Sequence, residues 1–355
     1  KNYGFLVPDS RKMLVDLYIP KEKLKGVKHG QKAVARLTEW PEKASSPFGE
    51  IIEVLGAPGD HGTEMHSILA EYGLPRDFPE EVKAAAAQVP DTIPHEEIKK
   101  RRDFRSVTTF TIDPADAKDF DDALHIEKLE NGNYEVGVHI ADVSHFVTPG
   151  SALDEEAFDR CFSVYLVDRT IPMLPEILSN ELCSLNPNED TLSFSAIFEI
   201  TPNAEVVSRK FGKSVIHSHK RFSYEEAQAV IDAESGPYVE ELNLMNDLAK
   251  KFAKKNREAG SIEFESEEIK FELDEDGHPI RIIKKERLDT HKLVEEFMLL
   301  ANREVAKFIY EYNREHGDMG LMYRIHDVPN IEKVEQLSVF LKAMGYYLPT
   351  DDEGV

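Results

Sequence analysis

Five aspartates crowd one short segment, FTIDPADAKDFDDAL: Asp113, Asp116, Asp119, Asp121 and Asp122. Carboxylates this close repel one another and raise one another's pKa values unless a cation compensates them. Magnesium suits that role, because it takes oxygen ligands and is typically held by one or two carboxylates together with substrate phosphate. Two such ions roughly 3.5–4 Å apart can activate a water molecule and stabilise the leaving oxygen of a phosphodiester. The segment therefore favours a magnesium site for phosphodiester hydrolysis.

Zinc and calcium fit the aspartate segment less well, whereas a purely structural role stays open. Zinc sites draw on histidine or cysteine, and the cluster has neither. A calcium loop of the EF-hand type starting at Asp113 would place Ala115 at its third position and Lys118 where glycine is required. The structural alternative is an acidic surface loop in which aspartates form turns and cap helices. Strand-like sequence on both sides argues against a tail without structure.

Motifs for other chemistries are incomplete. The run FGKS at 211–214 resembles the end of a phosphate-binding loop, but Val207 stands where that loop requires glycine. His139 and His145 lie near the aspartates in sequence, and we assign neither as a ligand or a base. The sequence contains no G-x-S-x-G elbow and no C-x-x-C pair. Metal-activated water is therefore the favoured mechanism.

Length and composition limit the class of protein. The chain has 355 residues, of which 41% are hydrophobic and 31% charged, as is typical of a soluble globular protein with two or three domains. No apolar run approaches the roughly 18 residues of a membrane span. Cys161 and Cys183 form no secreted disulfide framework. We therefore expect a cytoplasmic protein without a membrane partner. The sequence begins with Lys1 rather than Met, so we expect a fragment of a longer protein.

The charge is distributed unevenly along the chain. The net charge of −24 argues against a non-specific nucleic-acid binder, which is usually basic. Residues 1–40 nevertheless contain nine Lys or Arg against four acids. A basic N-terminal module is compatible with polyanion binding at one place. A solvated lysine-rich face accounts for the same count, and charge alone favours that simpler interpretation.

The pattern along the chain predicts an α+β protein that begins with a small OB-type β-barrel. Residues 1–57 contain four short strand-like runs separated by turns. Tyr3 and Phe5 alternate on the first run, where they form either a platform for stacking single-stranded bases or part of the barrel core. Residues 58–103 read as a packed helical connector, and a mixed α/β domain occupies 104–355.

Periodicity locates the elements of that last domain. Strands are expected at 106–113 and 192–201, with a hairpin over 123–143 that turns at Asn131–Gly132. Helices are expected at 152–162, 223–232, 238–260, 291–317 and 330–349. Ser223 and Glu226 have the spacing of a capping box at the start of the second of these helices.

Longer motifs resemble a known family. The runs TIDPADAKDFDDALHI, YEVGVHIADVSHFV and VYLVDRTIPMLPEILSNELCSLNP follow one another as in the catalytic RNB domain of the ribonuclease II/ribonuclease R family. The later runs GSIEFESEEIKFEL, HKLVEEFMLLANREVA and YRIHDVPN are most similar to the ribonuclease R branch. The opening YGFLVPD and DLYIP resemble that family's second cold-shock domain. The resemblance covers essentially the whole chain.

The resemblance implies a processive, hydrolytic 3′→5′ exoribonuclease that uses two magnesium ions and releases 5′-mononucleotides. Its partner would be the 3′ end of single-stranded RNA, including the overhang of a structured RNA. No small-molecule cofactor besides the metal is expected, and we expect a monomer.

Site residues follow from the resemblance position by position. The family's four metal-binding aspartates match Asp113, Asp119, Asp121 and Asp122, of which Asp121 matters most for the chemical step, while Asp116 falls outside the set. The aromatic pair that clamps the terminal bases matches Tyr165 and Phe264. An acid near the terminal nucleotide matches Glu295, and Glu296 is the weaker match.

The family's pattern continues beyond Val355 with an arginine-bearing SPIRRY-type segment and a C-terminal RNA-binding barrel. An inactive fragment of the enzyme is therefore one alternative function. A second alternative is a non-catalytic RNA-binding or regulatory protein on the same fold. A third is a metal-dependent nuclease that acts on DNA, because the aspartates alone do not distinguish the two nucleic acids.

Overall fold

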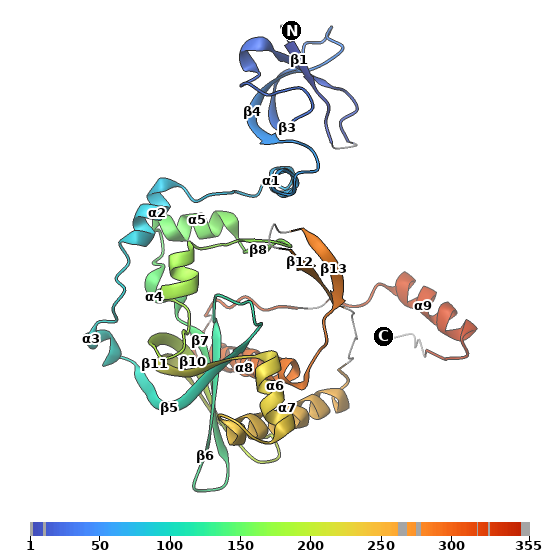
Figure 1. The fold of residues 1–355 in the computed structure, drawn as a ribbon. Coiled ribbons are helices and arrows are strands. Elements are labelled where there is room, and N and C mark those ends of the chain that lie inside the picture. Colours follow the sequence, from blue (N-terminus) through green and yellow to red (C-terminus); the bar gives the residue numbers. More distant parts are fainter. Residues whose placement is uncertain are drawn as a thin grey trace. The chain divides into compact units, whose positions relative to one another are not determined.

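A computed structural model describes residues 3–9, 12–261, 268–274, 278–317, 319–325 and 327–348 (Figure 1). The chain divides into a compact unit of residues 1–298 and a second unit of residues 299–355. The first unit contains an N-terminal sheet, a helical connector and a closed barrel with its surrounding helices. Its mixture of sheets and helices confirms the predicted α+β class.

The N-terminal sheet confirms the four predicted strands. Its hydrogen-bonded order is β1-β2-β4-β3, with bounds β1 Tyr3–Leu6, β2 Leu17–Pro20, β3 Lys32–Glu39 and β4 Phe48–Gly56. A short 3₁₀ turn, Lys21–Lys23, follows β2. Leu17, Ile19 and Ile51 form the buried centre of this sheet. Alternation along β2 places these aliphatic residues inward, as the period of a half-buried strand requires.

The segment between the N-terminal sheet and the barrel is helical and packed. Its helices are α1 His61–Glu71, α2 Glu80–Ala87 and α3 His95–Ile98. Val82 and Ala86 of α2 are buried in a cluster with Leu153 and Leu178 from the following domain. This shared apolar contact holds the connector against the domain that contains the barrel.

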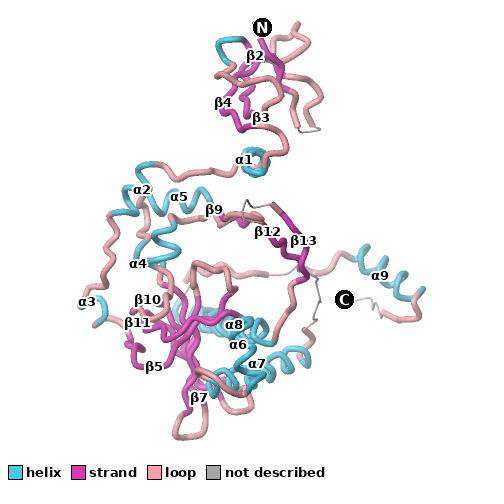
Figure 2. Tube along the Cα trace, in the orientation of Figure 1, coloured by secondary structure: helices cyan, strands magenta, loops and turns pink. Residues whose placement is uncertain are grey.

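The centre of the first unit is a closed five-stranded barrel, whose strands gather together in Figure 2. Its order is β10-β11-β5-β6-β7, with bounds β5 Arg102–Asp113, β6 Asp122–Lys128, β7 Tyr134–Ala141, β10 Asp190–Ile200 and β11 Val206–Ser223. The predicted strands and hairpin are confirmed. The long strand β11 was not predicted, because its basic and hydroxyl residues give no apolar run. It closes the barrel through parallel pairing with β5.

Hydrogen-bonded polar side chains cross the barrel interior. His125 Nδ1 lies 2.8 Å from His139 Nε2, and His139 Nδ1 lies 2.6 Å from Ser195 Oγ. Both histidines are fully buried, and burial holds the pKa of His139 well below its usual value. Gly137 makes room for the pair, since a Cβ there would lie 2.2 Å from His125 Cε1. The two histidines are thus structural residues of the barrel.

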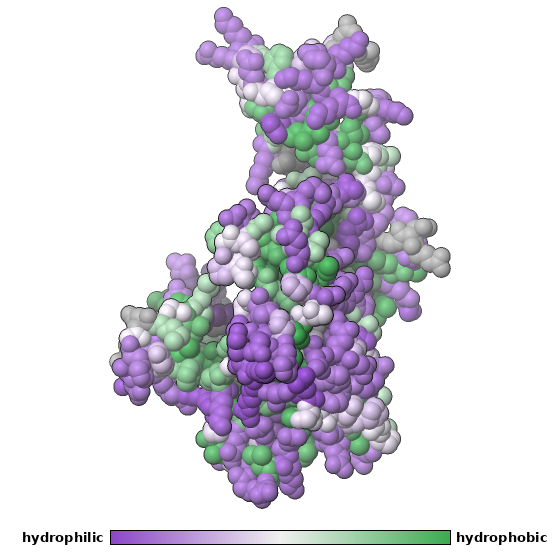
Figure 3. All heavy atoms as spheres, turned by 90° about the vertical axis from the view of Figure 1, so that its left-hand side faces the viewer, coloured by the Kyte–Doolittle hydropathy of each residue, from purple (hydrophilic) through white to green (hydrophobic). Residues whose placement is uncertain are grey.

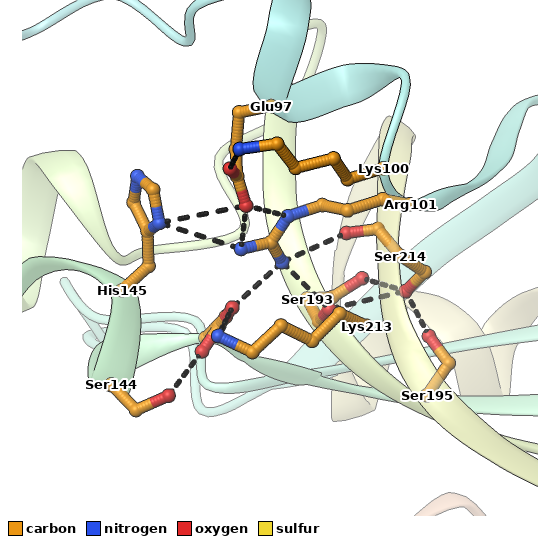
Figure 4. Close-up of polar contacts among 10 residues, drawn as sticks. Glu97, Lys100, Arg101, Ser144, His145, Ser193, Ser195, Lys213 and Ser214 are labelled. Carbon is orange, nitrogen blue, oxygen red and sulfur yellow. Dashed lines mark hydrogen bonds and ion pairs between the residues drawn. The ribbon is translucent and has the colours of Figure 1, made fainter.

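A buried ion pair joins the connector to one end of the barrel (Figure 4). Arg101, which follows α3, places Nη1 2.6 Å from Asp142 Oδ2, and both side chains are almost completely buried. Lys213 Nζ approaches the same oxygen at 3.2 Å, and Glu97 Oε1 accepts from Arg101 Nε at 2.9 Å. Asp142 follows β7 directly, so the network fixes the strand end that lies beside the aspartate segment.

The remaining elements surround the barrel or extend from it. They are α4 Val143–Phe146, α5 Ala152–Arg160, β8 Val164–Tyr165, β9 Thr170–Ile171, the π-helix Ile177–Leu182, α6 Tyr224–Ala233, α7 Val239–Glu258, β12 Ile269–Leu273, β13 Pro279–Lys284 and α8 Asp289–His316. The predicted capping box of Ser223 and Glu226 is confirmed. In the second unit, α9 spans Ile331–Ala343.

The face shown in Figure 3 is predominantly hydrophilic, with apolar side chains in separate patches, in keeping with the high charged content. Among the residues that the structure describes, every helix is too short or too polar to cross a lipid bilayer.

Candidate active site

The aspartate segment joins two neighbouring strands at the rim of the barrel. β5 ends at Asp113 and β6 begins at Asp122, and the two strands pair antiparallel. The backbone between them is held from two sides. Ala141 N, at the end of β7, donates to Asp121 O at 2.9 Å, and Ser184 Oγ accepts from Phe120 N at 2.9 Å. The carboxylates are therefore presented by anchored backbone.

The structure brings the four predicted aspartates into one electrostatic cluster. Burial raises the pKa of Asp122 to about 7, with further contributions from Asp113 and Asp121. Burial also raises the pKa of Asp113 to about 6, although Arg221 opposes the shift. The pKa of Asp121 is raised by loss of hydration and by Asp119. At each of these three aspartates, burial outweighs whatever the chain supplies to stabilise the negative charge.

Asp116 belongs to a different environment, in agreement with its exclusion from the predicted set. Its Oδ2 lies 2.7 Å from Lys270 Nζ on β12, at the exposed surface. The hydrogen bond from Lys270 lowers the pKa of Asp116. One aspartate of the segment is therefore compensated by a lysine, whereas burial and neighbouring aspartates raise the pKa values of Asp113, Asp121 and Asp122.

The donor set fits a hard divalent cation. All four side chains offer carboxylate oxygens, and the buried Asp113 Oδ2 has no hydrogen-bond partner. Within the described residues, no three His, Cys, Asp or Glu side chains converge into a ready-made metal site. Magnesium does not need one, because one or two carboxylates with water and substrate phosphate are its usual ligands. The residues present thus suit a metal that binds together with a phosphate-bearing substrate.

Tyr224 is a neighbour of the cluster that the sequence did not reveal. It begins α6, and burial followed by the charges of Asp122 and Asp113 raises its pKa to about 12. Its ring stacks on His291 of α8, with ring centroids 3.9 Å apart. The capping box located the start of α6 in the sequence. Only the parallel pairing of β11 with β5 shows that this start lies beside Asp113, where Ser223 is its register partner.

Arg221 is a second neighbour that the sequence did not reveal. Its Nη2 donates to Pro114 O at 2.5 Å, and its guanidinium carbon lies 5.5 Å from the centre of the Phe120 ring. The arginine therefore touches the aspartate segment at both ends, just after Asp113 and just before Asp121. Its positive charge lowers the pKa of Asp113, against the larger effect of burial.

The residues predicted to contact RNA are placed as follows. Tyr165 on β8 is 70% exposed, and its pKa is raised by partial burial and then by Asp119 and Asp121, so it lies within electrostatic reach of the cluster. Phe264 lies outside the described residues. Glu295 is exposed on α8 and forms an ion pair with Arg287. Glu296 accepts a hydrogen bond from Asn256 Nδ2 at 2.8 Å.

Tyr3 and Phe5 lie on the surface of the N-terminal sheet rather than in its core. Their exposed fractions are 47% and 54%. Tyr3 stacks on Tyr18 with ring centroids 5.4 Å apart, and Phe48 packs edge-on against Tyr18. The alternative that Tyr3 and Phe5 fill the barrel core is therefore wrong, and four aromatics share one accessible face.

Comparison with known proteins shows the family of the chain. The family model of the RNB domain matches residues 101–352, and that of the cold shock domain matches residues 5–79. Ribonuclease R of Thermotoga maritima is 40% identical over 351 residues, which cover 97% of this chain and 49% of that protein. The chain thus spans about half the length of this curated relative.

Solved structures share the fold at low sequence identity. The structure of Mycoplasma genitalium RNase R in complex with ribose-methylated single-stranded RNA matches with a TM-score of 0.88 and 23% identity, over 99% of this chain and 57% of that one. A yeast pseudonuclease matches with a TM-score of 0.74 and 22% identity, over 99% of this chain and 44% of that one. From the family models and the curated relatives together, this chain belongs to the RNB-domain family of ribonuclease R and ribonuclease II.

Proposed function

We propose that the chain is the aspartate-bearing part of a 3′→5′ hydrolytic exoribonuclease. Such an enzyme would degrade single-stranded RNA, and structured RNA with a 3′ overhang, processively to 5′-mononucleotides. The observation that carries the proposal is the cluster of four aspartates at the barrel rim, with raised pKa values at Asp113, Asp121 and Asp122. Membership in the RNB family supports it.

Asp113, Asp119, Asp121 and Asp122 would hold magnesium, and we propose two ions. When bound, such ions lower the pKa of a coordinated water and neutralise charge on the scissile phosphodiester. The chain's own contribution is to present the carboxylates on anchored backbone, with Phe120 and Asp121 held by Ser184 and Ala141. Asp113 Oδ2 and Asp122 are kept from bulk water, which strengthens their attraction for a cation.

RNA would reach the cluster through stacking rather than through base-specific hydrogen bonds. Tyr165 is exposed beside the aspartates, and we propose that it clamps the terminal base together with Phe264, with Glu295 nearby. Tyr3 and Phe5 would stack bases further along the strand. Aromatic stacking accepts any base and contributes roughly 1–3 kcal/mol per base. This tolerance suits an enzyme that must degrade every sequence. We propose that the enzyme acts as a monomer in the cytoplasm.

The domain organisation is part of the proposal. Residues 1–57 would be the cold-shock RNA-binding domain, 58–103 the connector and 104–355 the N-terminal portion of the catalytic domain. The match of the two family models to residues 5–79 and 101–352 supports this order.

The test compares the wild type with Asp121→Asn on 5′-labelled single-stranded RNA, in magnesium and in EDTA. We expect a magnesium-dependent ladder shrinking from the 3′ end in the wild type and no cleavage by Asp121→Asn, while RNA binding survives. Asp116→Asn is the matched control, because Asp116 lies in the same segment but pairs with Lys270. Normal cleavage by Asp121→Asn, or equal losses in both variants, would contradict the site.

A non-catalytic RNA-binding protein is the second candidate function. The observation that favours it is the absence of a converged three-ligand metal site among the described residues, together with the likeness to a pseudonuclease. It predicts that RNA binds but no mononucleotide appears in magnesium, also with a longer chain that spans the full length of the relatives. Equal degradation of matched RNA and DNA would instead favour a nuclease without sugar selectivity.

A further inference from the structure

Helix α1 is fastened to the N-terminal sheet. Lys32 Nζ on β3 lies 2.6 Å from Glu64 Oε2, and Glu64 Oε1 accepts a hydrogen bond from Gly59 N at 2.8 Å. The buried Thr63 donates from Oγ1 to Leu55 O at 3.4 Å. The contact is close, because a Cβ on Gly56 would lie 2.2 Å from Thr63 Oγ1. The start of α1 therefore moves with the sheet that carries Tyr3 and Phe5.

The same turn of α1 reaches the catalytic part of the chain. His61 Nε2 lies 2.8 Å from Asp168 Oδ2, across a sequence separation of 107 residues. The two side chains are only 14% and 10% exposed. The His61 ring also packs edge-on against His278, which directly precedes β13, with ring centroids 5.6 Å apart. One histidine thus contacts two hairpins of the catalytic domain.

Asp168 lies at the tip of the ribbon that carries Tyr165. The ribbon consists of β8 and β9, with only two residues in each strand, and Tyr165 pairs with Thr170. Its turn is closed by Leu166 N, which donates to Arg169 O at 2.8 Å. A two-stranded ribbon is marginally stable by itself. The position of the exposed Tyr165 ring therefore depends on what anchors the tip, and Asp168 supplies that anchor through His61.

We propose that the His61–Asp168 pair is a positioning contact that couples the N-terminal sheet to the Tyr165 ribbon. An RNA strand bound on the N-terminal sheet would then restrain the Tyr165 ribbon in the position in which Tyr165 receives the terminal base. The inference rests on the proposed function, because it takes Tyr165 as the stacking partner of that base. Neither His61 nor Asp168 acts on the reacting atoms; both act through the placement of Tyr165.

The choice of variant follows from the partners of Asp168. Arg169 Nη2 lies 2.6 Å from Asp168 Oδ2, so removal of His61 leaves the carboxylate paired within its own turn. His61→Ala therefore cuts the connection to α1 and spares the ribbon's internal contacts. His66→Ala is the matched control, because it removes the same side chain from the same helix away from the contact.

The experiment reads base stacking directly and needs no catalysis. Each variant of the full chain is titrated in EDTA into single-stranded RNA with 2-aminopurine as the 3′-terminal base, whose fluorescence falls when it stacks. We expect His61→Ala to weaken the quenched complex roughly fivefold, as for the loss of one partly buried hydrogen bond. His66→Ala should match the wild type, and Tyr165→Ala should abolish the quenching. In the Tyr165→Ala background, His61→Ala should have no further effect.

Two results would overturn the inference, and they are distinguishable. If Tyr165→Ala abolishes quenching while His61→Ala and Asp168→Asn leave it unchanged, the coupling is absent and the base clamp stands. If Tyr165→Ala leaves the quenching unchanged, the clamp of the proposed function fails and the coupling fails with it. Should His61→Ala lose its folded circular-dichroism spectrum, His61→Phe carries the test, because it keeps a ring at this position, removes the nitrogen that contacts Asp168 and leaves the pair of Asp168 with Arg169 intact.

Discussion

Two acidic sites at the same rim of the barrel have opposite electrostatic environments. Asp122 begins β6, and Asp142 follows β7, the strand paired with β6. Burial raises the pKa of Asp142, but hydrogen bonds from Ser144, Arg101 and Lys213 outweigh it and lower the pKa. For Asp122, burial and neighbouring aspartates act in the same direction and raise the pKa to about 7.

The difference separates a carboxylate whose charge the chain compensates from one whose ionisation costs the folded state free energy. Burying a charge costs free energy in both places. The chain itself supplies cations to Asp142, so the folded state is satisfied there. At Asp122 burial is not offset in this way, so a proton or a cation from outside would lower the cost of its charge.

The largest effect is expected when Asp142 loses its main cation partner. Arg101→Met leaves Asp142 buried with Lys213 as its remaining cation. Breaking a buried pair from one side costs about 3–5 kcal/mol, because it strands the other charge. We expect the free energy of unfolding, measured by urea denaturation, to fall by about this amount.

Arg102→Met is the matched control for that prediction. The neighbouring Arg102 is 45% exposed and lies 3.5 Å from Glu135. An exposed pair contributes at most about 1 kcal/mol, so this variant should unfold nearly as the wild type does. If the two variants lose equal stability, the contrast between buried and exposed pairs at this end of the barrel is wrong.

The next variant, Asp122→Asn, is expected to stabilise the protein. Asp122→Asn removes an uncompensated charge while keeping the shape of the side chain. Without metal at pH 8, we expect the free energy of unfolding to rise by about 1–2 kcal/mol, because a raised carboxylate pKa means that ionisation destabilises the folded state. Asp142→Asn, in contrast, should destabilise the protein. Urea denaturation of both variants in EDTA measures the difference.

The gain from Asp122→Asn should depend on pH. The folded-state pKa of Asp122, about 7, lies above the ordinary value of 3.8. Between these values the folded state binds more protons than the unfolded state, so the penalty shrinks as the pH falls. The variant's advantage over the wild type should therefore be largest at pH 8 and nearly gone by pH 4.5. An advantage that does not change with pH would point to packing rather than charge.

Local sequence was sufficient to predict part of the fold and part of the candidate site. The four aspartates lie within ten residues, so their proximity did not depend on the fold. The capping box of Ser223 and Glu226 involves neighbours three residues apart and was equally readable. The hairpin over 123–143 was marked by its Asn131–Gly132 turn. Such features depend on contacts within a few residues, where spacing alone carries the information.

The rest depended on contacts between distant segments. β11 pairs in parallel with β5 about a hundred residues earlier, and this pairing alone brings Tyr224 and Arg221 to the aspartates. The pair of Arg101 with Asp142 and that of His61 with Asp168 likewise join residues with no local signal. Charged residues of this kind read as surface positions in the sequence. Burial, which the topology decides, makes them structural.

The smallest effect is expected from added magnesium, which tests whether a cation binds at the aspartate cluster around Asp122. A metal that binds only the folded state stabilises it by RT ln(1 + [L]/Kd), or about 1 kcal/mol at a concentration five times Kd. Magnesium should therefore raise the free energy of unfolding of the wild type at pH 8 by about that amount. Asp116→Asn should keep this gain, because Asp116 pairs with Lys270, whereas Asp122→Asn should lose most of it. Equal gains in all three proteins would show that magnesium acts by general screening, and the contrast between the two rim sites would then have no bearing on metal binding.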